Sequence, residues 1–201
     1  RALEICDILQ NDALKPVSLI QNAYILNSVN LTDKAIEQIH KAMHLCTTQK
    51  LYLLEASALH CLSQIYAKTG LYAQAMEVIE KALHTVRQFG ESKDIAKVLQ
   101  TYAVYLQGSN RIQESFTLLY EAIDICTHRE DNLGLAICFG GLAYSYGQNK
   151  EFQHAHDCFF RALALEESLF PVSTIRLASL LKGIALTYAA LKKYDTALEY
   201  A

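Results

Sequence analysis

The chain has 201 residues, of which 52 % are hydrophobic and 19 % are charged. This composition excludes an intrinsically disordered chain, which could not bury enough apolar surface to fold. The formal net charge is -3 with histidine counted as neutral, and no run of lysine or arginine exceeds two residues, so nucleic acid and membrane are not expected as partners. No stretch approaches about eighteen apolar residues and no secretory signal follows Arg1, which predicts a cytoplasmic protein.

Alanine recurs every 40 residues along the chain, each time followed by an apolar residue. These alanines are Ala2, Ala42, Ala82, Ala122 and Ala162. Self-similarity at a fixed period indicates a repeat array, in which each unit buries its apolar face by stacking on the next. A long coiled coil is not expected, because the period is not a heptad and turn signals interrupt every predicted helix.

Each unit of this period is predicted to be a pair of antiparallel helices. In the unit at 51–90, Leu59, Leu62 and Tyr66 lie at helical spacing. Thr69 and Gly70 then break the pattern, and a second apolar series at helical spacing follows the break. This sequence of signals is typical of a helix hairpin.

The repeats divide the chain as follows. Residues 1–10 are predicted to end a preceding repeat, and residues 173–201 to begin a further one. Between them we expect four repeats, with a slip of two residues around Pro171, at 11–50, 51–90, 91–130 and 131–172. Because both ends match only part of a repeat, the chain is predicted to be a slice of a longer protein with exposed apolar end faces.

The residues at fixed offsets within each unit resemble the tetratricopeptide repeat (TPR) family over essentially the whole chain. In the unit at 131–172 they are Phe139, Leu142, Ala143, Tyr146, Phe152, Ala155, Phe159 and Ala162. The usual TPR period is about 34 residues, so the longer period implies longer helices, as in the variety found in signalling proteins. The resemblance implies an all-α, right-handed superhelical solenoid of antiparallel helix hairpins.

In this family the first helix of each repeat lines a concave groove, which is the default binding surface. Carried onto this chain, the family's groove offsets give a lining that is apolar in its first unit and mildly basic in its middle. Such a lining suits an extended peptide or a partner helix, with amides for backbone hydrogen bonds and lysines for carboxylates. The predicted partner-binding residues are Tyr24, Asn27, His60, Gln64, Lys68, Lys97, Gln100, Gln107, Tyr144 and Lys182, and the same offsets include Ser57, Ile137, Gln148, Ser179 and Leu186.

No group of residues predicts a reaction, a cofactor or a bound metal. The six cysteines include no CxxC pair, and Cys6, Cys46 and Cys126 are predicted to be small buried hydrophobes in a reducing compartment. His40 and His44 lie four apart on one predicted helix, but no cysteine or carboxylate completes a zinc site around them.

The sequence therefore predicts a noncatalytic protein- or peptide-binding scaffold, the sensory or regulatory segment of a larger bacterial cytoplasmic signalling protein. One alternative is a receptor for a peptide pheromone, in which the peptide tightens the superhelix. Self-association through the exposed end faces is a second, and an enzyme or enzyme subunit is a third. A receptor for chaperone tails is not expected, because His60 and Gln64 stand where such family members place lysine and asparagine.

Overall fold

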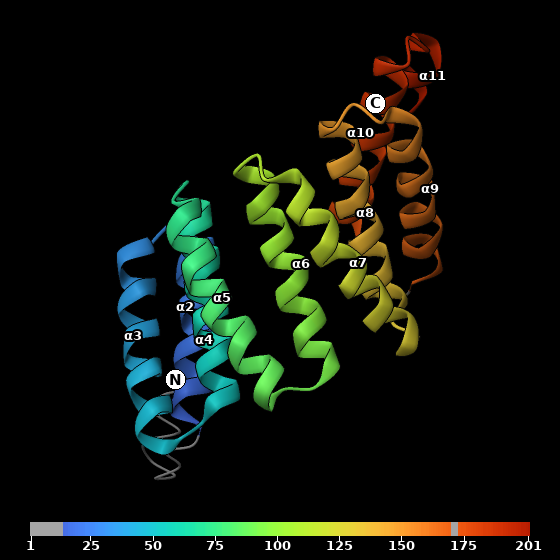
Figure 1. The fold of residues 1–201 in the computed structure, drawn as a ribbon. Coiled ribbons are helices and arrows are strands. Elements are labelled where there is room, and N and C mark those ends of the chain that lie inside the picture. Colours follow the sequence, from blue (N-terminus) through green and yellow to red (C-terminus); the bar gives the residue numbers. More distant parts are fainter. Residues whose placement is uncertain (1–13, 170–172) are drawn as a thin grey trace. The chain divides into compact units, whose positions relative to one another are not determined.

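The computed structural model describes residues 14–169 and 173–201, and every regular element in these ranges is a helix (Figure 1). The chain divides into two compact units, residues 1–98 and 99–201. The expected helix end at 1–10, Cys6 and the slip around Pro171 lie outside the described residues. The helices are α2 (Lys15–Ser28), α3 (Thr32–Gln49), α4 (Tyr52–Lys68), α5 (Tyr72–Phe89), α6 (Ser92–Gly108), α7 (Ile112–His128), α8 (Asn132–Gln148), α9 (Phe152–Ser168), α10 (Thr174–Ala190) and α11 (Tyr194–Glu199).

Consecutive helices pack against each other as hairpins. In the first unit α2 packs on α3 and α4 packs on α5, and in the second unit α8 packs on α9 and α10 packs on α11. We call α2, α4, α6, α8 and α10 the first helices, and α3, α5, α7, α9 and α11 the second helices. The predicted all-α architecture of helix hairpins is confirmed.

A tight turn joins the two helices of each hairpin. In the turn after α4, the backbone amide of Leu71 donates to the carbonyl oxygen of Tyr66 at 2.9 Å, and Glu151 repeats this bond to Tyr146 at 2.9 Å. These bonds satisfy carbonyls that the helix end leaves unpaired. Each turn needs one left-handed residue, and only glycine adopts that conformation without a Cβ penalty. The left-handed residues of these turns are Asn30, Gly70, Asn110, Lys150 and Lys192, and Lys50 and Glu130 are left-handed in connections between hairpins.

Replacing Lys150 by glycine is expected to stabilise the second unit by up to about 1 kcal/mol, because relief of the left-handed strain, roughly 1–2 kcal/mol, is partly offset by the greater unfolded-state entropy of glycine. Lys150 is exposed and its φ is 63°. Asn149→Gly is the matched control in the same turn. Its φ of -79° suits any residue, so glycine there relieves no strain. It adds unfolded-state entropy and removes the exposed hydrogen bond from the Asn149 side-chain amide to the Glu151 carboxylate, so a slight destabilisation is expected. Urea unfolding followed by circular dichroism compares the two, and a less stable Lys150→Gly protein would contradict the strain assigned to Lys150.

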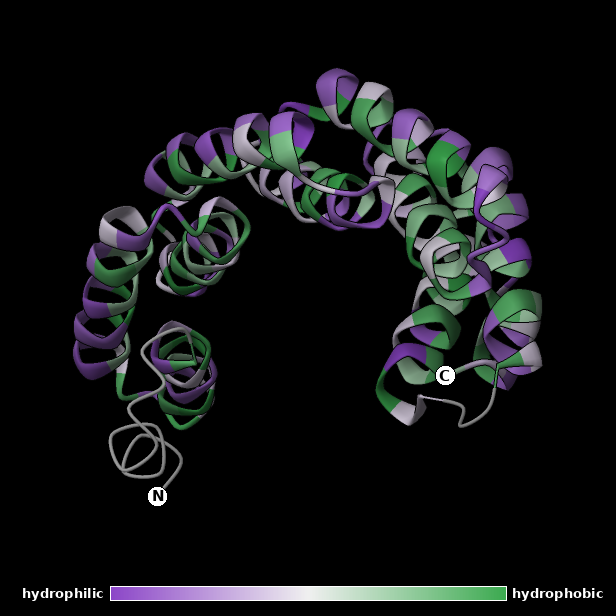
Figure 2. Cartoon of the chain, turned by 90° about the horizontal axis from the view of Figure 1, so that it is seen from below, coloured by the Kyte–Doolittle hydropathy of each residue, from purple (hydrophilic) through white to green (hydrophobic). Residues whose placement is uncertain are grey.

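The alanines that mark the repeat period lie in the interior of each unit. All four that the structure describes are fully buried, so a larger side chain at these positions would have to displace a neighbouring helix. Hydrophobic and hydrophilic residues alternate along the helices, as expected where each helix buries one face (Figure 2). The buried markers are Ala42, Ala82, Ala122 and Ala162.

The two predicted cysteines within the described residues are also buried. Cys46 and Cys126 are free thiols with no exposed surface, which confirms their expected place in the packing. Burial raises the pKa of the Cys46 thiol to about 11. This thiol therefore stays protonated and inert at neutral pH.

One position of the repeat departs from the apolar pattern, because it carries the fully buried Glu166. Its Oε1 accepts a hydrogen bond from the backbone amide of Ser173 at 3.0 Å, and its Oε2 accepts one from Nε of Arg176 at 2.9 Å. The Arg176 side chain holds the pKa of this carboxyl below its ordinary value. Glu166 thus fastens the start of α10 to the end of α9. Its counterparts at earlier periods are the buried Cys46, Val86 and Cys126.

Candidate partner-binding surface

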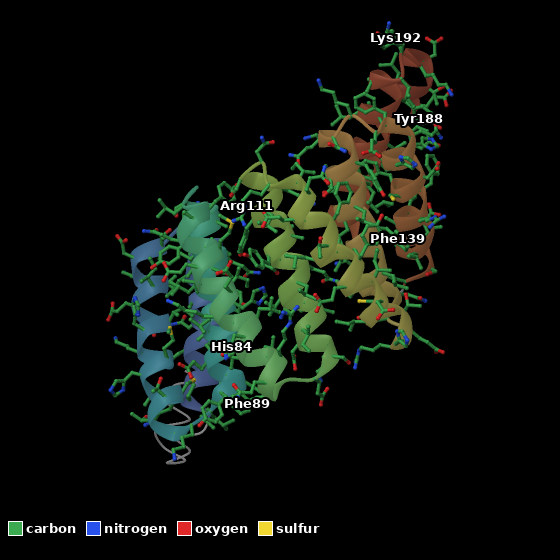
Figure 3. The ribbon with its side chains drawn as sticks, viewed as in Figure 1. His84, Phe89, Arg111, Phe139, Tyr188 and Lys192 are labelled. Atoms are coloured by element: carbon green, nitrogen blue, oxygen red, sulfur yellow. The ribbon has the colours of Figure 1, made fainter. Side chains whose placement is uncertain are left out.

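Exposed apolar side chains are concentrated on the first helices. Within the described residues, the large exposed ones on second helices are few: Phe89, Tyr120, Tyr194 and Leu198. Phe89, labelled in Figure 3, lies at the end of α5 and stacks on Tyr52 with ring centroids 4.4 Å apart. The first helices expose Tyr24, Ile25, Tyr52, Leu53, Val104, Leu133, Ile137, Tyr144, Ile175 and Leu186.

The first and second helices also differ in their charged side chains. Over the described part of the chain, the first helices carry only two carboxylates, Glu55 and Asp94, and both are half-buried. Their exposed lysines are Lys68, Lys93, Lys97 and Lys182. The second helices carry every exposed helical carboxylate of this part, namely Asp33, Glu37, Glu77, Glu80, Glu114, Asp124, Asp157, Glu167, Asp195 and Glu199.

We call the exposed side chains of the first helices the first-helix surface. It is apolar and basic in both units. The second helices instead present mixed charges that pair with each other along the helix, such as Lys41 with Glu37 at 2.6 Å and Lys81 with Glu77 at 2.8 Å. Exposed pairs of this kind contribute only a few tenths of a kcal/mol, about 0.3–0.5. The two sets of helices therefore differ in the partner they could attract.

In the first unit, a cavity of about 270 Å³ brings together three of the residues at groove offsets, Ser57, His60 and Lys97. His60 is only 4 % exposed, and its Nε2 lies 3.5 Å from Nε2 of Gln64. Burial, aided by the charge of Lys97, lowers the pKa of His60 to about 4. The imidazole is therefore neutral at pH 7. Leu53, Leu54, Ala56, Val86, Glu91, Lys93, Asp94 and Val98 complete the lining.

The remaining residues predicted in the first unit lie near the end of α2. Nζ of Lys68 donates to the backbone carbonyl of Asn27, which ties the end of α4 to the end of α2. The side-chain oxygen of Asn27 is buried and has no hydrogen-bond partner within the described chain. Tyr24 lies on the exposed side of α2. The structure thus brings Asn27 and Lys68 together.

In the second unit, Gln100 and Gln107 use their amides inside the protein. Nε2 of Gln100 donates to the carbonyl oxygen of Gly134 at 3.1 Å, and Nε2 of Gln107 donates to that of Gly141 at 2.9 Å. Gln107 also donates to Oγ of Ser145 at 2.9 Å. Both side chains are half-buried bridges from α6 to α8. The Nε2 groups of both glutamines are therefore engaged within the protein in this structure, and a role in binding a peptide stays a prediction.

A second cavity, of about 230 Å³, lies in the second unit and has an almost entirely apolar lining. Three residues at groove offsets, Tyr144, Gln148 and Leu186, contribute to it. The Tyr144 hydroxyl donates to the carbonyl oxygen of Ser179 at 3.3 Å, which links α8 to α10. Sequence reasoning missed the other lining residues, because they belong to helix-packing positions: Ala143, Gly147, Phe152, Phe159, Gly183 and Thr187.

The last predicted residue, Lys182, does not line that cavity but lines an apolar depression of about 580 Å³, which shares Leu186 with the cavity. The depression lies between α10 and α11 and includes Leu181, Tyr194 and Leu198. Figure 3 labels Tyr188 and Lys192 in the same part of the chain. Three groups of predicted residues are therefore brought together locally: His60 with Lys97, Asn27 with Lys68, and Tyr144 with its neighbours at groove offsets.

The described residues show no group of three or more histidine, cysteine, aspartate and glutamate side chains placed to hold a metal ion. His40 and His44 line a shallow depression on α2 and α3 together with Lys15, Glu37 and Lys41. None of the helices in the described ranges has the length and apolar character needed to span a bilayer.

Helix hairpins of this kind define a helical-repeat protein, a class that generally serves as an interaction scaffold. Residues 56–88, which contain most of the α4–α5 hairpin, match the family described as Tetratricopeptide repeat. The predicted resemblance to this family is confirmed, and the chain is a TPR-like solenoid. Comparison with curated proteins gives no match.

Solved structures agree on the fold. A putative kinesin light chain of Podosopora anserina with nearly identical TPR-like repeats is 17 % identical, with a TM-score of 0.73 over 94 % of this chain and 92 % of that one. PilF of Pseudomonas aeruginosa is 20 % identical, with a TM-score of 0.71 over 94 % and 74 %. A Rap protein complexed with competence and sporulation factor is 15 % identical, with a TM-score of 0.80 over 93 % of this chain and 52 % of its own. This chain thus spans about half the length of the Rap protein.

Proposed function

We propose that the chain is a noncatalytic scaffold whose first-helix surface binds a peptide or helix that carries both apolar and acidic residues. The observation that carries the proposal is the division of charge, with exposed lysines but no exposed carboxylate on the described first helices, although Glu91 is exposed directly before α6. An acidic segment gains attraction on this surface and is repelled by the carboxylates of the second helices. Exposed Tyr144 and Leu186, which line the apolar cavity, and exposed Ile137, on the same helix as Tyr144, supply contacts for apolar side chains.

The test is selection of binders from a random peptide library on the whole chain. Selected peptides are expected to be enriched in acidic and large apolar residues. Their affinity is expected to fall by about tenfold or more, equivalent to about 1.4 kcal/mol, when Lys93, Lys97 and Lys182 are all replaced by glutamate. A rise in salt is expected to weaken binding in the same direction.

The matched control replaces Lys34, Lys41 and Lys81 by glutamate, which changes the net charge equally but acts on second helices. Circular dichroism first establishes that both variants keep the helix content of the parent. Equal losses of affinity in the two variants would mean that binding follows net charge and not the first-helix surface. Peptides without acidic residues would also count against the proposal.

We infer in addition that the scaffold is a regulatory segment of a larger cytoplasmic signalling protein, in which bound peptide changes the helix packing. The likeness in fold to a Rap protein complexed with competence and sporulation factor supports a peptide-regulated variant of this function. A selected peptide is then expected to lower the radius of gyration of the chain in small-angle X-ray scattering. An unchanged radius at saturation would favour a passive scaffold.

Self-association is a second proposed activity, which the apolar depression between α10 and α11 supports. Leu198 is 75 % exposed there and Tyr194 lies beside it. The chain is expected to form concentration-dependent oligomers in sedimentation velocity, and Leu198→Glu is expected to shift them to monomer, because a charge cannot be buried unpaired in such a contact. Oligomers that persist in this variant would exclude the depression as the contact.

A further inference from the structure

The side chain of Gln107 fills a fixed place between two successive first helices. The helices α6, α8 and α10 each have 17 residues, so their positions correspond one to one. Gln107 is the sixteenth residue of α6. Its Nε2 donates to the carbonyl oxygen of Gly141 and to Oγ of Ser145, the tenth and fourteenth residues of α8, at 2.9 Å each. A carboxamide of the chain itself therefore bridges these two helices.

One repeat later the same place is open. The sixteenth residue of α8 is Gly147, which has no side chain, and the tenth and fourteenth residues of α10 are Gly183 and Thr187. All three line the cavity of about 230 Å³. A Cβ built on Gly147 would meet no atom within 4 Å. The cavity thus occupies the place that Gln107 fills one repeat earlier.

The lining of this cavity has an exposed rim and a buried wall. Tyr144, Gln148 and Leu186 are exposed and belong to the first-helix surface, whereas Gly183 and Thr187 are buried. None of the described residues that line it is charged, so a charged group inside would lose its hydration without an ion partner. An apolar cavity of about 150 Å³ holds benzene, so this larger one has room for a neutral side chain.

The buried wall offers acceptors of the kind that Gln107 uses. Oγ1 of Thr187 donates to the carbonyl oxygen of Ile184 at 2.7 Å, and a hydroxyl oxygen that donates can still accept. A carbonyl oxygen has two lone pairs, so Gly141 can accept from Gln107 within a helix, and Gly183 holds the same helix position. A neutral group with two N–H donors on an apolar stem matches this wall.

We propose that the cavity binds the side chain of a glutamine in the bound peptide, whose carboxamide repeats the bridge that Gln107 makes. Its Nε2 would donate to the carbonyl oxygen of Gly183 and to Oγ1 of Thr187, while its methylene groups pack on Phe159, which also lines the cavity. The proposal rests on the proposed function for the peptide and adds a preferred side chain to it. A glutamate of nearly the same size is disfavoured by its charge, and a methionine has no N–H donor.

The first test uses propionamide, which is the glutamine side chain without its backbone, and follows the amide signals of the protein by NMR. Propionamide is expected to displace the signals of Gly183 and Thr187. It is expected to bind about fivefold or more tightly than 2-butanone, which has the same shape but no N–H donor. Propionate is expected to leave these signals unchanged. Binding of 2-butanone as tight as that of propionamide, or no displacement by propionamide, would overturn the amide site.

A variant of the chain can supply the glutamine itself. Gly147→Gln is expected to raise the thermal unfolding midpoint, because glutamine has the higher helix propensity, and to abolish the response to propionamide. Ala67→Gln is the matched control, since Ala67 is the sixteenth residue of α4 in the first unit, and it is expected to respond as the parent does. A full response in Gly147→Gln would overturn the cavity as the binding place. If a variant folds poorly, the comparison of propionamide with 2-butanone on the parent chain still decides the question.

Peptides selected on the whole chain show whether a peptide is the source of the amide. They are expected to share one glutamine. Its replacement by methionine is expected to lower affinity about fivefold or more for the parent chain, but not for Gly147→Gln. An equal loss in both proteins would show that the glutamine binds elsewhere.

The remaining outcomes separate this site from the scaffold function. If propionamide binds but no glutamine recurs among the selected peptides, the peptide is wrong as the source of the amide. If neither propionamide nor the glutamine has an effect, while replacement of Lys93, Lys97 and Lys182 by glutamate still lowers peptide affinity, this site fails and the scaffold function stands.

Discussion

Replacing Glu166 by alanine is expected to destabilise the second unit by about 3 kcal/mol, near the lower end of the cost of breaking a buried ion pair. The carboxylate is fully buried, whereas the Arg176 side chain that would lose its partner is 40 % exposed and can be rehydrated. The backbone amide of Ser173 would also lose its acceptor. Urea unfolding at pH 7 measures the loss.

The stabilisation by Glu166 is expected to disappear in acid. Arg176 lowers the pKa of this carboxyl below its ordinary value of 4.5, so the folded protein holds the ionised form more strongly than the unfolded chain does. The contribution is fully present above pH 4.5 and is lost as pH falls through the lowered folded-state pKa. The difference between parent and Glu166→Ala should therefore shrink in strong acid. A difference that stays constant there would contradict the ion-pair account.

The neighbouring Glu167 supplies a matched control for this measurement. It is exposed on the same helix and also carries a carboxylate. Glu167→Ala is expected to change stability by no more than about 0.5 kcal/mol, as is usual for surface substitutions. Similar losses in the two variants would show that a general change of charge in α9, and not the buried contact, determines stability.

Replacing Gly183 by alanine is the second change with a large expected effect, a loss of about 3 kcal/mol by overpacking. A Cβ at this position would lie 2.3 Å from Cζ of Phe159, and that ring is itself almost fully buried. Helix α10 would have to move away from α9 to make room. Thermal unfolding of the variant should therefore show a lower midpoint, and an unchanged midpoint would contradict the close packing of these two helices.

Gly147→Ala is the control, and it is expected to raise the stability of the second unit instead of lowering it. A Cβ at Gly147 would meet no atom within 4 Å, so the gain in helix propensity, up to about 1 kcal/mol, is not offset by a clash. Because Gly147 lines the apolar cavity of the second unit, the added methyl group should also reduce the space there. A destabilised Gly147→Ala protein would contradict the openness of this site.

The helix hairpins were predictable because their signals are local and repeated. The buried alanines recur at one period, and the break at Thr69 and Gly70 falls between α4, which ends at Lys68, and α5, which starts at Tyr72. Apolar spacing and turn residues act over a few positions and need no knowledge of neighbouring repeats. The sequence therefore carried the fold class without a structure.

The site was less predictable, because it depends on which side chains meet between repeats. His60 and Gln100 occupy the same repeat position, yet one borders a cavity and the other is engaged by the Gly134 carbonyl. The repeat position of a residue is the same for both side chains, and it does not specify the distance between neighbouring helices at that position. Glu166 did leave a usable signal, since a carboxylate stands where Cys126 and other apolar residues stand in earlier repeats.

The most direct test of the central claim is a map of amide chemical shifts in the chain with and without a selected acidic peptide. The account predicts that the largest changes in amide chemical shift fall on first-helix residues such as Lys97, Tyr144 and Leu186, which lie among the exposed lysines and apolar side chains. The amide signals of exposed residues in α3 and α5 are expected not to change. Shifts concentrated on second helices would contradict the first-helix surface as the binding site.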